Sequence, residues 1–210
     1  MLIGFNGSPK PDSNLKRIME MMLQESGKEY RIYDLAHMNI KPCIGCVKCA
    51  KTNRCVVADD MKPLYDEIVA AEGIVVGAVV YFRKPNGFTH NFLERLFPLR
   101  HKEPQTMGKH AVAIAVGGNE AELVCEEISY QLSSYFNFEI LDKFFYNTMT
   151  PPCFICGFGT TCRYGGPARW MSPEEFENLN EITPEMSQKF EDQGDLVNRV
   201  KEIGQRLGGL

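Results

Sequence analysis

The amino-acid sequence predicts an α/β protein with a doubly wound five-stranded parallel sheet, in which helices cover both faces and make three layers. Strand-like and helix-like segments alternate along residues 2–146 in the order βαβαβαβαβ. Residues 73–82 and 111–116 are apolar almost throughout, which is typical of parallel strands buried on both faces. Loops at 7–14, 81–88 and 117–120 follow the first, third and fourth strands. In such a sheet these loops meet at the carboxyl edge, where ligands bind.

The individual elements follow from short-range patterns. Residues 2–5 form the first predicted strand, and apolar residues at helical spacing between 15 and 23 predict the next helix. Residues 30–35 form the second strand, and Asp59-Asp60 precede a helix that runs to Ala71. After the strand at 73–82, the pattern predicts a helix over 88–97, a strand over 111–116, a helix from 120 to about 135 and a strand over 139–146.

The loop 6–14 is the first place where a ligand could bind. A strand, a small polar loop and a helix in succession direct backbone N–H groups at an anion. The loop has neither the GxGxxG spacing of dinucleotide-binding folds nor a Walker motif. A turn in which Ser13 or Asn14 caps the helix explains the same residues. The loop alone therefore leaves phosphate binding and simple capping as open alternatives.

Four of the eight cysteines lie within thirteen residues at the spacing C-x2-C-x2-C-x5-C. They are Cys43, Cys46, Cys49 and Cys55. Four sulfurs on so short a segment converge only if a metal centre holds them, because thiolates repel one another. Consecutive x2 intervals resemble the iron–sulfur run of bacterial ferredoxins, whereas zinc sites usually use two separated pairs. A [4Fe-4S] cluster is therefore favoured over zinc, with disulfides or free thiols as further alternatives.

Length, charge and cysteine content limit the classes of protein to consider. A chain of 210 residues is long enough for one domain and an extension. A net charge of −4 with scattered basic residues argues against nucleic-acid binding. No apolar run approaches the ~20 residues of a membrane span, and no secretion signal is evident. With eight cysteines, we expect a cytoplasmic protein whose thiols serve metal or redox chemistry.

Residues 1–147 resemble the flavodoxin-like NAD(P)H-dependent FMN reductase superfamily, and the cysteine run resembles its iron–sulfur flavoprotein branch. The resemblance is carried by GSPKPDSN after the first strand, PCIGCVKCAKTNRC followed by DDM, and VVYF at the end of the third strand. It implies a flavodoxin-like FMN-binding domain over 1–147, with an inserted cysteine loop at 42–58. Residues 148–210 are left as an extension with a second cysteine group and two helices.

The resemblance also implies the positions that hold each cofactor. The first loop would bind the FMN phosphate through Ser8, Lys10, Ser13, Asn14 and Leu15. The loops after the third and fourth strands would flank the isoalloxazine through Tyr81, Phe82, Arg83, Gly87, Gly117 and Gly118. The cluster ligands would be the four cysteines of the run. At the ring loop the chain departs from the family, because bulky and charged residues replace a glycine- and serine-rich turn.

The extension contains a second cysteine group that repeats the C-x2-C and C-x5-C intervals of the first. It consists of Cys153, Cys156 and Cys162. A second metal site (zinc or iron–sulfur), a disulfide or redox-active thiols, and incidental packing are the alternatives. Ser172-Pro173-Glu174-Glu175 predicts a capped helix start. Thr183-Pro184 predicts the start of a final helix whose apolar face contains Met186, Phe190, Val197, Val200 and Ile203.

These observations predict an iron–sulfur flavoprotein oxidoreductase that transfers electrons between FMN, a nearby [4Fe-4S] cluster and an external carrier. FMN is expected rather than FAD, because the first loop offers one phosphate cradle and no dinucleotide pattern. The resemblance implies a ferredoxin-like carrier or NAD(P)H as partner, and a homodimer or homotetramer. One rival is an NAD(P)H-dependent FMN or quinone reductase with structural zinc. Another is a non-catalytic metal-binding or redox-sensing module that holds no flavin tightly.

Overall fold

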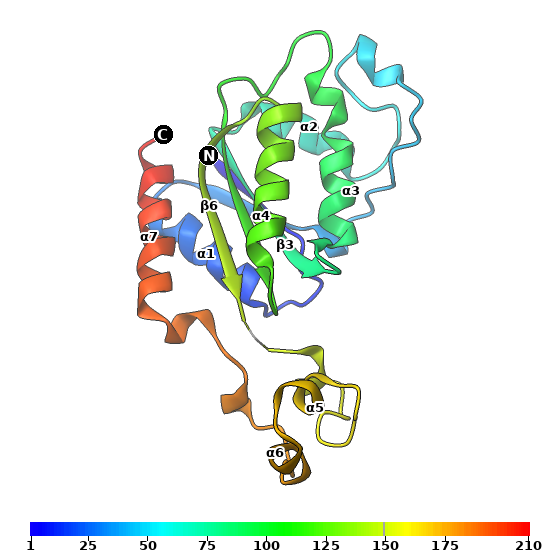
Figure 1. Ribbon diagram of the computed structural model, residues 1–210. Coiled ribbons are helices and arrows are strands. Elements are labelled where there is room, and N and C mark those ends of the chain that lie inside the picture. The colour runs from blue at the N-terminus through cyan, green and yellow to red at the C-terminus, as the bar shows by residue number, and fades with distance from the viewer. Residues whose placement is uncertain (149) are drawn as a thin grey trace.

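The computed structural model describes residues 1–148 and 150–210 and contains a six-stranded sheet (Figure 1). Its parallel strands are β1 (Leu2–Asn6), β2 (Tyr30–Asp34), β3 (Gly73–Tyr81), β5 (His110–Gly117) and β6 (Glu139–Asn147). They lie in the order β2-β1-β3-β5-β6, so the connections wind in opposite directions on the two sides of β1. In doubly wound sheets this switch point between β1 and β3 is where a ligand binds.

The predicted fold class is confirmed, whereas the predicted number of strands is one too few. The additional strand is β4 (Lys84–Pro85), which folds back from the end of β3 and pairs with it in antiparallel fashion. Proline and glycine in 83–87 are typical of a chain break, so a two-residue strand there leaves no sequence pattern to recognise.

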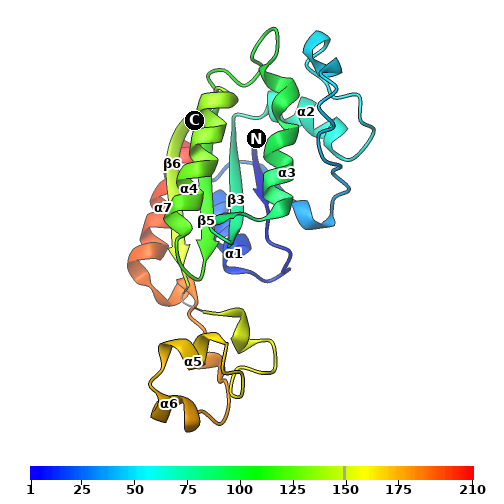
Figure 2. The same cartoon turned by 45° about the vertical axis from the view of Figure 1, so that its right-hand side comes forward.

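Helices cover both faces of the sheet and produce the three predicted layers (Figures 1 and 2). One face is covered by α1 (Asn14–Glu25) and α7 (Gly194–Gly208). The other is covered by α2 (Met61–Ala70), α3 (Gly87–Arg95) and α4 (Ala121–Tyr130). Alternate residues of β1 pack into the two layers, with Leu2 toward α1 and Ile3 toward α2. Two short helices, α5 (Gly166–Trp170) and α6 (Pro173–Glu177), lie in the segment beyond β6.

Helix ends agree with their capping signals in most places. The Ser13 side chain accepts a hydrogen bond from the Lys16 backbone N–H at 3.2 Å and so caps α1. Ser172 and Glu175 form the predicted capping box at the start of α6. The helix predicted from 120 to about 135 is α-helical only to Tyr130 and continues as a π-helical turn over Gln131–Tyr135.

The predicted start of the final helix is wrong, because α7 begins at Gly194 and not at Thr183-Pro184. Residues 184–186 and 190–192 form separate 3-10 turns with extended backbone between them. In that stretch the Gln188 backbone N–H donates to the Thr150 hydroxyl at 3.1 Å, and its carbonyl accepts from Asn14 Nδ2 at 3.5 Å. These contacts with distant residues replace the local hydrogen bonds that a helix requires.

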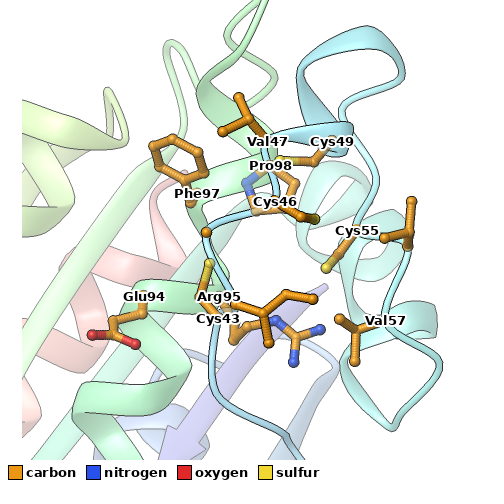
Figure 3. Close-up of a pocket in the computed structure, with 13 residues that line it drawn as sticks. Cys43, Cys46, Val47, Cys49, Cys55, Val57, Glu94, Arg95, Phe97 and Pro98 are labelled. Atoms are coloured by element: carbon orange, nitrogen blue, oxygen red, sulfur yellow. The ribbon is translucent and has the colours of Figure 1, made fainter.

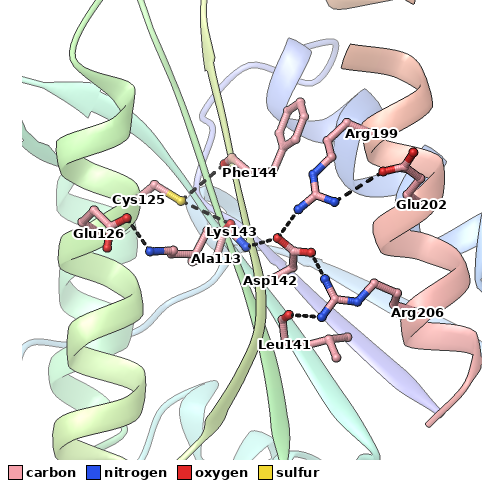
Figure 4. A network of polar contacts seen from close by, with 10 residues as sticks. All are labelled: Ala113, Cys125, Glu126, Leu141, Asp142, Lys143, Phe144, Arg199, Glu202 and Arg206. Atoms are coloured by element: carbon pink, nitrogen blue, oxygen red, sulfur yellow. Dashed lines mark hydrogen bonds and ion pairs between the residues drawn. The ribbon is translucent and has the colours of Figure 1, made fainter. Parts of the chain in front are cut away.

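A polar network fastens α7 to the edge strand β6 (Figure 4). The Asp142 carboxylate accepts a hydrogen bond from Arg199 Nη2 at 2.6 Å and is also paired with Arg206. Arg206 Nη2 donates to the Leu141 carbonyl at 2.7 Å. The last helix of the extension is thereby part of the layer that contains α1. Within the described residues, 1–148 and 150–210, every helix is too short or too polar to cross a membrane.

Candidate functional site

The loop after β1 is held against β3 and α3 at the switch point of the sheet. The Gly7 N–H donates to the Gly77 carbonyl at 3.0 Å, and Asn86 Nδ2 donates to the Gly7 carbonyl at 2.7 Å. A Cβ at position 7 would lie 1.9 Å from Thr89 Oγ1, so only glycine fits there. The loop is therefore fixed at its base against β3 and α3.

The predicted phosphate ligands all lie in this loop or in the first turn of α1. Ser8 is buried and Lys10 is exposed. The Ser8 backbone N–H donates to Asn6 Oδ1 at 3.1 Å, and Ser8 Oγ accepts from the Lys10 N–H at 3.3 Å. The first N–H groups of a helix have no partner within it, so those of Asn14 and Leu15 are available to an anion.

The side chains of Ser13 and Asn14 are already engaged in this structure. Ser13 caps α1, and Asn14 Oδ1 accepts a hydrogen bond from Arg17 Nη2 at 2.5 Å. Arg17 is also paired with Asp12 and Glu191, each at 2.5 Å. The capping alternative is thus confirmed for Ser13. A capping hydroxyl can still donate its own proton to a phosphate oxygen, so phosphate binding through Ser13 stays a prediction.

The loop after β3 is a tight hairpin rather than an open ring loop. Phe82 and Arg83 both have left-handed φ values, 51° and 64°, as a two-residue type I′ turn requires. Neither is glycine, and each such residue costs about 1–2 kcal/mol relative to right-handed backbone. The turn leaves Phe82 99% exposed.

An ion pair between Arg83 and Glu120, at 3.1 Å, links this hairpin to the loop after β5. The predicted ring residues Tyr81, Phe82 and Arg83 therefore lie beside Gly117 and Gly118, whereas Gly87 is the first residue of α3. The three loops meet at one edge of the sheet, as predicted. That they contact a flavin stays a prediction.

The four cysteines of the first run line one pocket (Figure 3). Cys43 and Cys46 are exposed, Cys55 is half-buried and Cys49 is buried. Left-handed backbone at Gly45 and Val47 turns the chain around the pocket, and the 3-10 helix Lys48–Lys51 carries Cys49. The opposite wall is formed by residues 94–98, at the end of α3.

The chemistry of this pocket suits a thiophilic metal group. Apolar side chains line the pocket together with the thiols, among them Ile44, Val47, Val56 and Phe97. Burial raises the pKa of the Cys49 thiol, and charge on the other three cysteines would raise it further. Among the residues that the structure describes, no three Cys, His, Asp or Glu side chains converge on the position of a single metal ion. Four spaced thiols around an apolar pocket fit a multinuclear cluster, which takes one ligand at each iron.

A buried ion pair closes the two ends of the cysteine loop. Arg95 is 1% exposed, and its guanidinium binds the Asp59 carboxylate through Nη1 at 2.5 Å and Nη2 at 3.1 Å. Arg95 Nη1 also donates to the Lys41 carbonyl at 2.5 Å, while Asp59 Oδ2 accepts from the Lys41 N–H at 2.9 Å. Because Lys41 precedes the first cysteine and Asp59 follows the last, one pair fixes both ends.

Most polar atoms of the Asp59–Arg95 pair have a hydrogen-bond partner. Burial would raise the pKa of the Asp59 carboxyl, but the hydrogen bonds from Arg95 and Lys41 outweigh it and lower that pKa. Arg95 Nε has no hydrogen-bond partner although it is buried beside the thiols. An unpaired donor here provides a favourable contact for an anionic group, such as a thiolate-ligated cluster.

Residues 1–146 match the family model of NADPH-dependent FMN reductase. The chain belongs to this family. An iron–sulfur flavoprotein of Methanocaldococcus jannaschii is 32% identical over 121 residues, covering 56% of this chain and 62% of the relative. One from Methanosarcina thermophila is 31% identical over 121 residues, covering 56% and 63%. The matches thus span less than two thirds of these relatives, whose names support the predicted branch.

Solved structures show the same fold at low identity. A flavone reductase matches 99% of this chain and 62% of its own, with a TM-score of 0.61 and 16% identity. A Megasphaera elsdenii flavodoxin matches all of both chains, with a TM-score of 0.53 and 8% identity. These likenesses confirm the flavodoxin-like fold.

The cysteine pocket and the carboxyl-edge loops of this family member lie at opposite ends of α3 (Figure 1). The helix begins at Gly87, beside the hairpin, and ends at Arg95, beside the thiols. Its nine residues span about 13 Å at 1.5 Å per residue. The pocket is therefore a helix length away from the loops that were predicted to surround the flavin.

Two residues of the site were missed in the sequence. Arg95 resembles an ordinary cation in the last turn of a helix, and Asp59 resembles a helix-start acid. Asp59 does accept a hydrogen bond from the Met61 N–H at 3.2 Å, so that interpretation was partly right. No local pattern reveals that the two pair across 36 positions.

Proposed function

We propose that this protein is a cytoplasmic iron–sulfur flavoprotein oxidoreductase. FMN bound at the carboxyl edge would exchange electrons with a [4Fe-4S] cluster on Cys43, Cys46, Cys49 and Cys55, and with a carrier such as ferredoxin. The observation that supports this most is the gathering of four thiols around one pocket in a member of the FMN reductase family. FMN supplies the step between two-electron and one-electron chemistry when it is bound.

The roles of the protein's own residues follow from their positions. The Gly7 loop and the start of α1 would orient the phosphate through backbone N–H groups. The hairpin at Phe82-Arg83 would cover the ring, and its exposure leaves room for a second subunit or a carrier at that face. At the other end of α3, the Asp59–Arg95 pair would hold the thiols in place, and the apolar side chains that line the pocket would contact the cluster.

Composition of the purified protein is the direct test. Anaerobically purified protein is expected to contain one FMN per chain and about four irons at the first cysteine pocket. Its spectrum should show a broad absorption near the flavin bands that dithionite bleaches. The rival is an NAD(P)H-dependent FMN or quinone reductase with structural zinc; the family's description names NADPH and FMN but no metal. That rival predicts FMN with zinc and no iron. Protein that contains neither flavin nor metal would rule out both.

The phosphate loop gives a second test, through Ser13→Ala. Losing one hydrogen bond to a charged group costs about 1.5–3 kcal/mol, or about 10- to 150-fold in affinity. We expect FMN binding to weaken by that factor and riboflavin binding, which involves no phosphate, to stay almost unchanged. Asn14→Ala is expected to behave in the same way. Fluorescence titration of apoprotein measures both flavins.

The matched control is Ser172→Ala, which removes the same kind of helix cap at α6, away from this loop. It is expected to leave the affinities for both flavins unchanged. If Ser13→Ala weakens FMN and riboflavin equally, Ser13 acts as a cap and not as a phosphate ligand.

A further inference from the structure

The segment 151–189 is held together by very little apolar burial. Within it, only Pro151, Gly159, Gly165 and Pro167 are buried. Its large apolar side chains are exposed instead, including Ile155, Phe158, Tyr164 and Trp170. Units below about 40 residues usually need disulfides, metals or oligomerisation to fold. A segment with this little core therefore needs a disulfide, a metal or a contact with another subunit.

Three cysteines lie in the part of this segment that is folded into successive turns, between residues 152 and 165. The Gly166 backbone N–H donates to Cys153 Sγ at 3.1 Å, and the Phe158 N–H donates to Cys156 Sγ at 3.4 Å. Gly157 has a left-handed φ of 81°, which turns the Phe158 N–H back toward the sulfur. Cys156 Sγ also donates to the Cys153 carbonyl at 3.3 Å, so these two cysteines lie in one turn.

The third thiol belongs to the same turn. The Cys162 N–H donates to the Phe158 carbonyl at 2.9 Å, and the Gly165 N–H donates to the Cys162 carbonyl at 3.1 Å. A Cβ at position 165 would lie 3.2 Å from Cys153 Sγ and 3.5 Å from Cys162 Cβ, so these two cysteines approach each other around that glycine. A single disulfide would leave one of the three thiols unpaired.

We propose that Cys153, Cys156 and Cys162 bind one soft metal ion of the zinc class, in a site separate from the pocket at residues 43–55. Three thiolates leave one tetrahedral position for a water molecule or an outside ligand. Among the described residues these thiols do not yet converge on one point, so binding includes closure of the loop. Metal binding and ordering of 151–189 are then coupled.

This coupling would reach the flavin loop. The segment follows the carboxyl end of β6 and lies on the same side of the molecule as the loops at that edge (Figures 1 and 2). Its end is bound to the first turn of α1, where Gln188 contacts Asn14 and Glu191 pairs with Arg17. The metal would thus order the segment that supports the phosphate loop from outside.

The test is metal content of the full chain with Cys153→Ser/Cys156→Ser. We expect loss of one zinc per chain, with the irons of the first pocket retained and FMN bound more weakly than by the unmodified chain, because the segment that supports the phosphate loop is no longer ordered. Cleavage between residues 150 and 190 by a protease is expected to become at least tenfold faster. The control is Cys125→Ser, whose thiol is buried in α4 and donates to the Ala113 and Phe144 carbonyls. It should retain the zinc and the protease resistance.

A second measurement uses the unmodified chain, in case the double variant misfolds. Removal of zinc by a chelator should expose the same segment to the protease, and Co²⁺ should restore resistance and add sulfur-to-cobalt absorption. An unchanged metal count in the double variant would overturn the proposal, as would loss of iron and sulfide in place of zinc. The proposal would also be overturned if protease resistance depended on protein concentration and not on zinc, because that result indicates oligomerisation.

Discussion

Cys46→Ser is expected to remove the iron of the first pocket and to leave FMN bound. A serine hydroxyl is a much poorer ligand for iron than a thiolate, and Cys46 lines the pocket with the other three cysteines. The loops that we propose bind FMN lie at the opposite end of α3, so removing the cluster should not disturb them. Iron should fall from about four per chain to near zero at this site.

Metal analysis and flavin extraction on the same anaerobic preparation measure both cofactors. Cys125→Ser is the matched control, because burial raises the pKa of that thiol to about 12 and keeps it protonated. It should retain iron and flavin alike. Full iron retention in Cys46→Ser would show that the run is not the cluster site, whatever its spacing suggests.

The sequence predicted the sheet well because its signals are local. A parallel strand buried on both faces, such as 73–81, is apolar over its whole length, and no distant residue is needed to recognise it. The elements that it missed depend on distant partners. The backbone at Gln188 bonds to Thr150 and Asn14 and not to its own neighbours, so an apparent helical repeat of apolar residues became two separate turns.

In the candidate site, too, local features were predicted and features that depend on distant residues were missed. Cysteine spacing indicates that four thiols gather, because they are close in sequence. It does not indicate that the pocket is completed by the end of α3, or that it lies a helix length from the flavin loops. Arg95 went unrecognised because its burial depends on Asp59 and Lys41, which neither adjoin it nor form a motif with it.

Of the single substitutions proposed here, Asp59→Asn is expected to lower the free energy of unfolding most. It leaves the Arg95 guanidinium buried without a counter-charge, and breaking a buried ion pair in this way costs about 3–5 kcal/mol. Because the pair holds both ends of the cysteine loop, iron should be lost as well. Asp66→Asn is the control, since Asp66 pairs with Arg54 but is 77% exposed, and should cost less than about 1 kcal/mol.

At acid pH, the free energies of unfolding of Asp59→Asn and of the unmodified protein should become more similar. The pKa of Asp59 is lowered in the folded state, so the unfolded state binds its proton more readily as the pH falls. The stability that this carboxylate contributes is fully present above its unfolded pKa of about 3.9 and is lost as the pH falls through the lower folded value. Urea unfolding of both proteins at neutral pH and near pH 3, in the same cofactor state, measures this.

A double variant distinguishes the cost of an unpaired buried charge from the cost of losing the ion pair altogether. Asp59→Leu/Arg95→Met removes both ions, and apolar replacement of a buried pair is often nearly neutral or stabilising. It should therefore be more stable than Asp59→Asn, although it lacks the hydrogen bonds to Lys41 that anchor the loop. The difference in free energy of unfolding between Asp59→Asn and the unmodified protein could instead stay constant with pH. That result would show that the charge of the carboxylate does not stabilise the loop. Iron bound by a stable double variant would show that the thiols gather without this anchor.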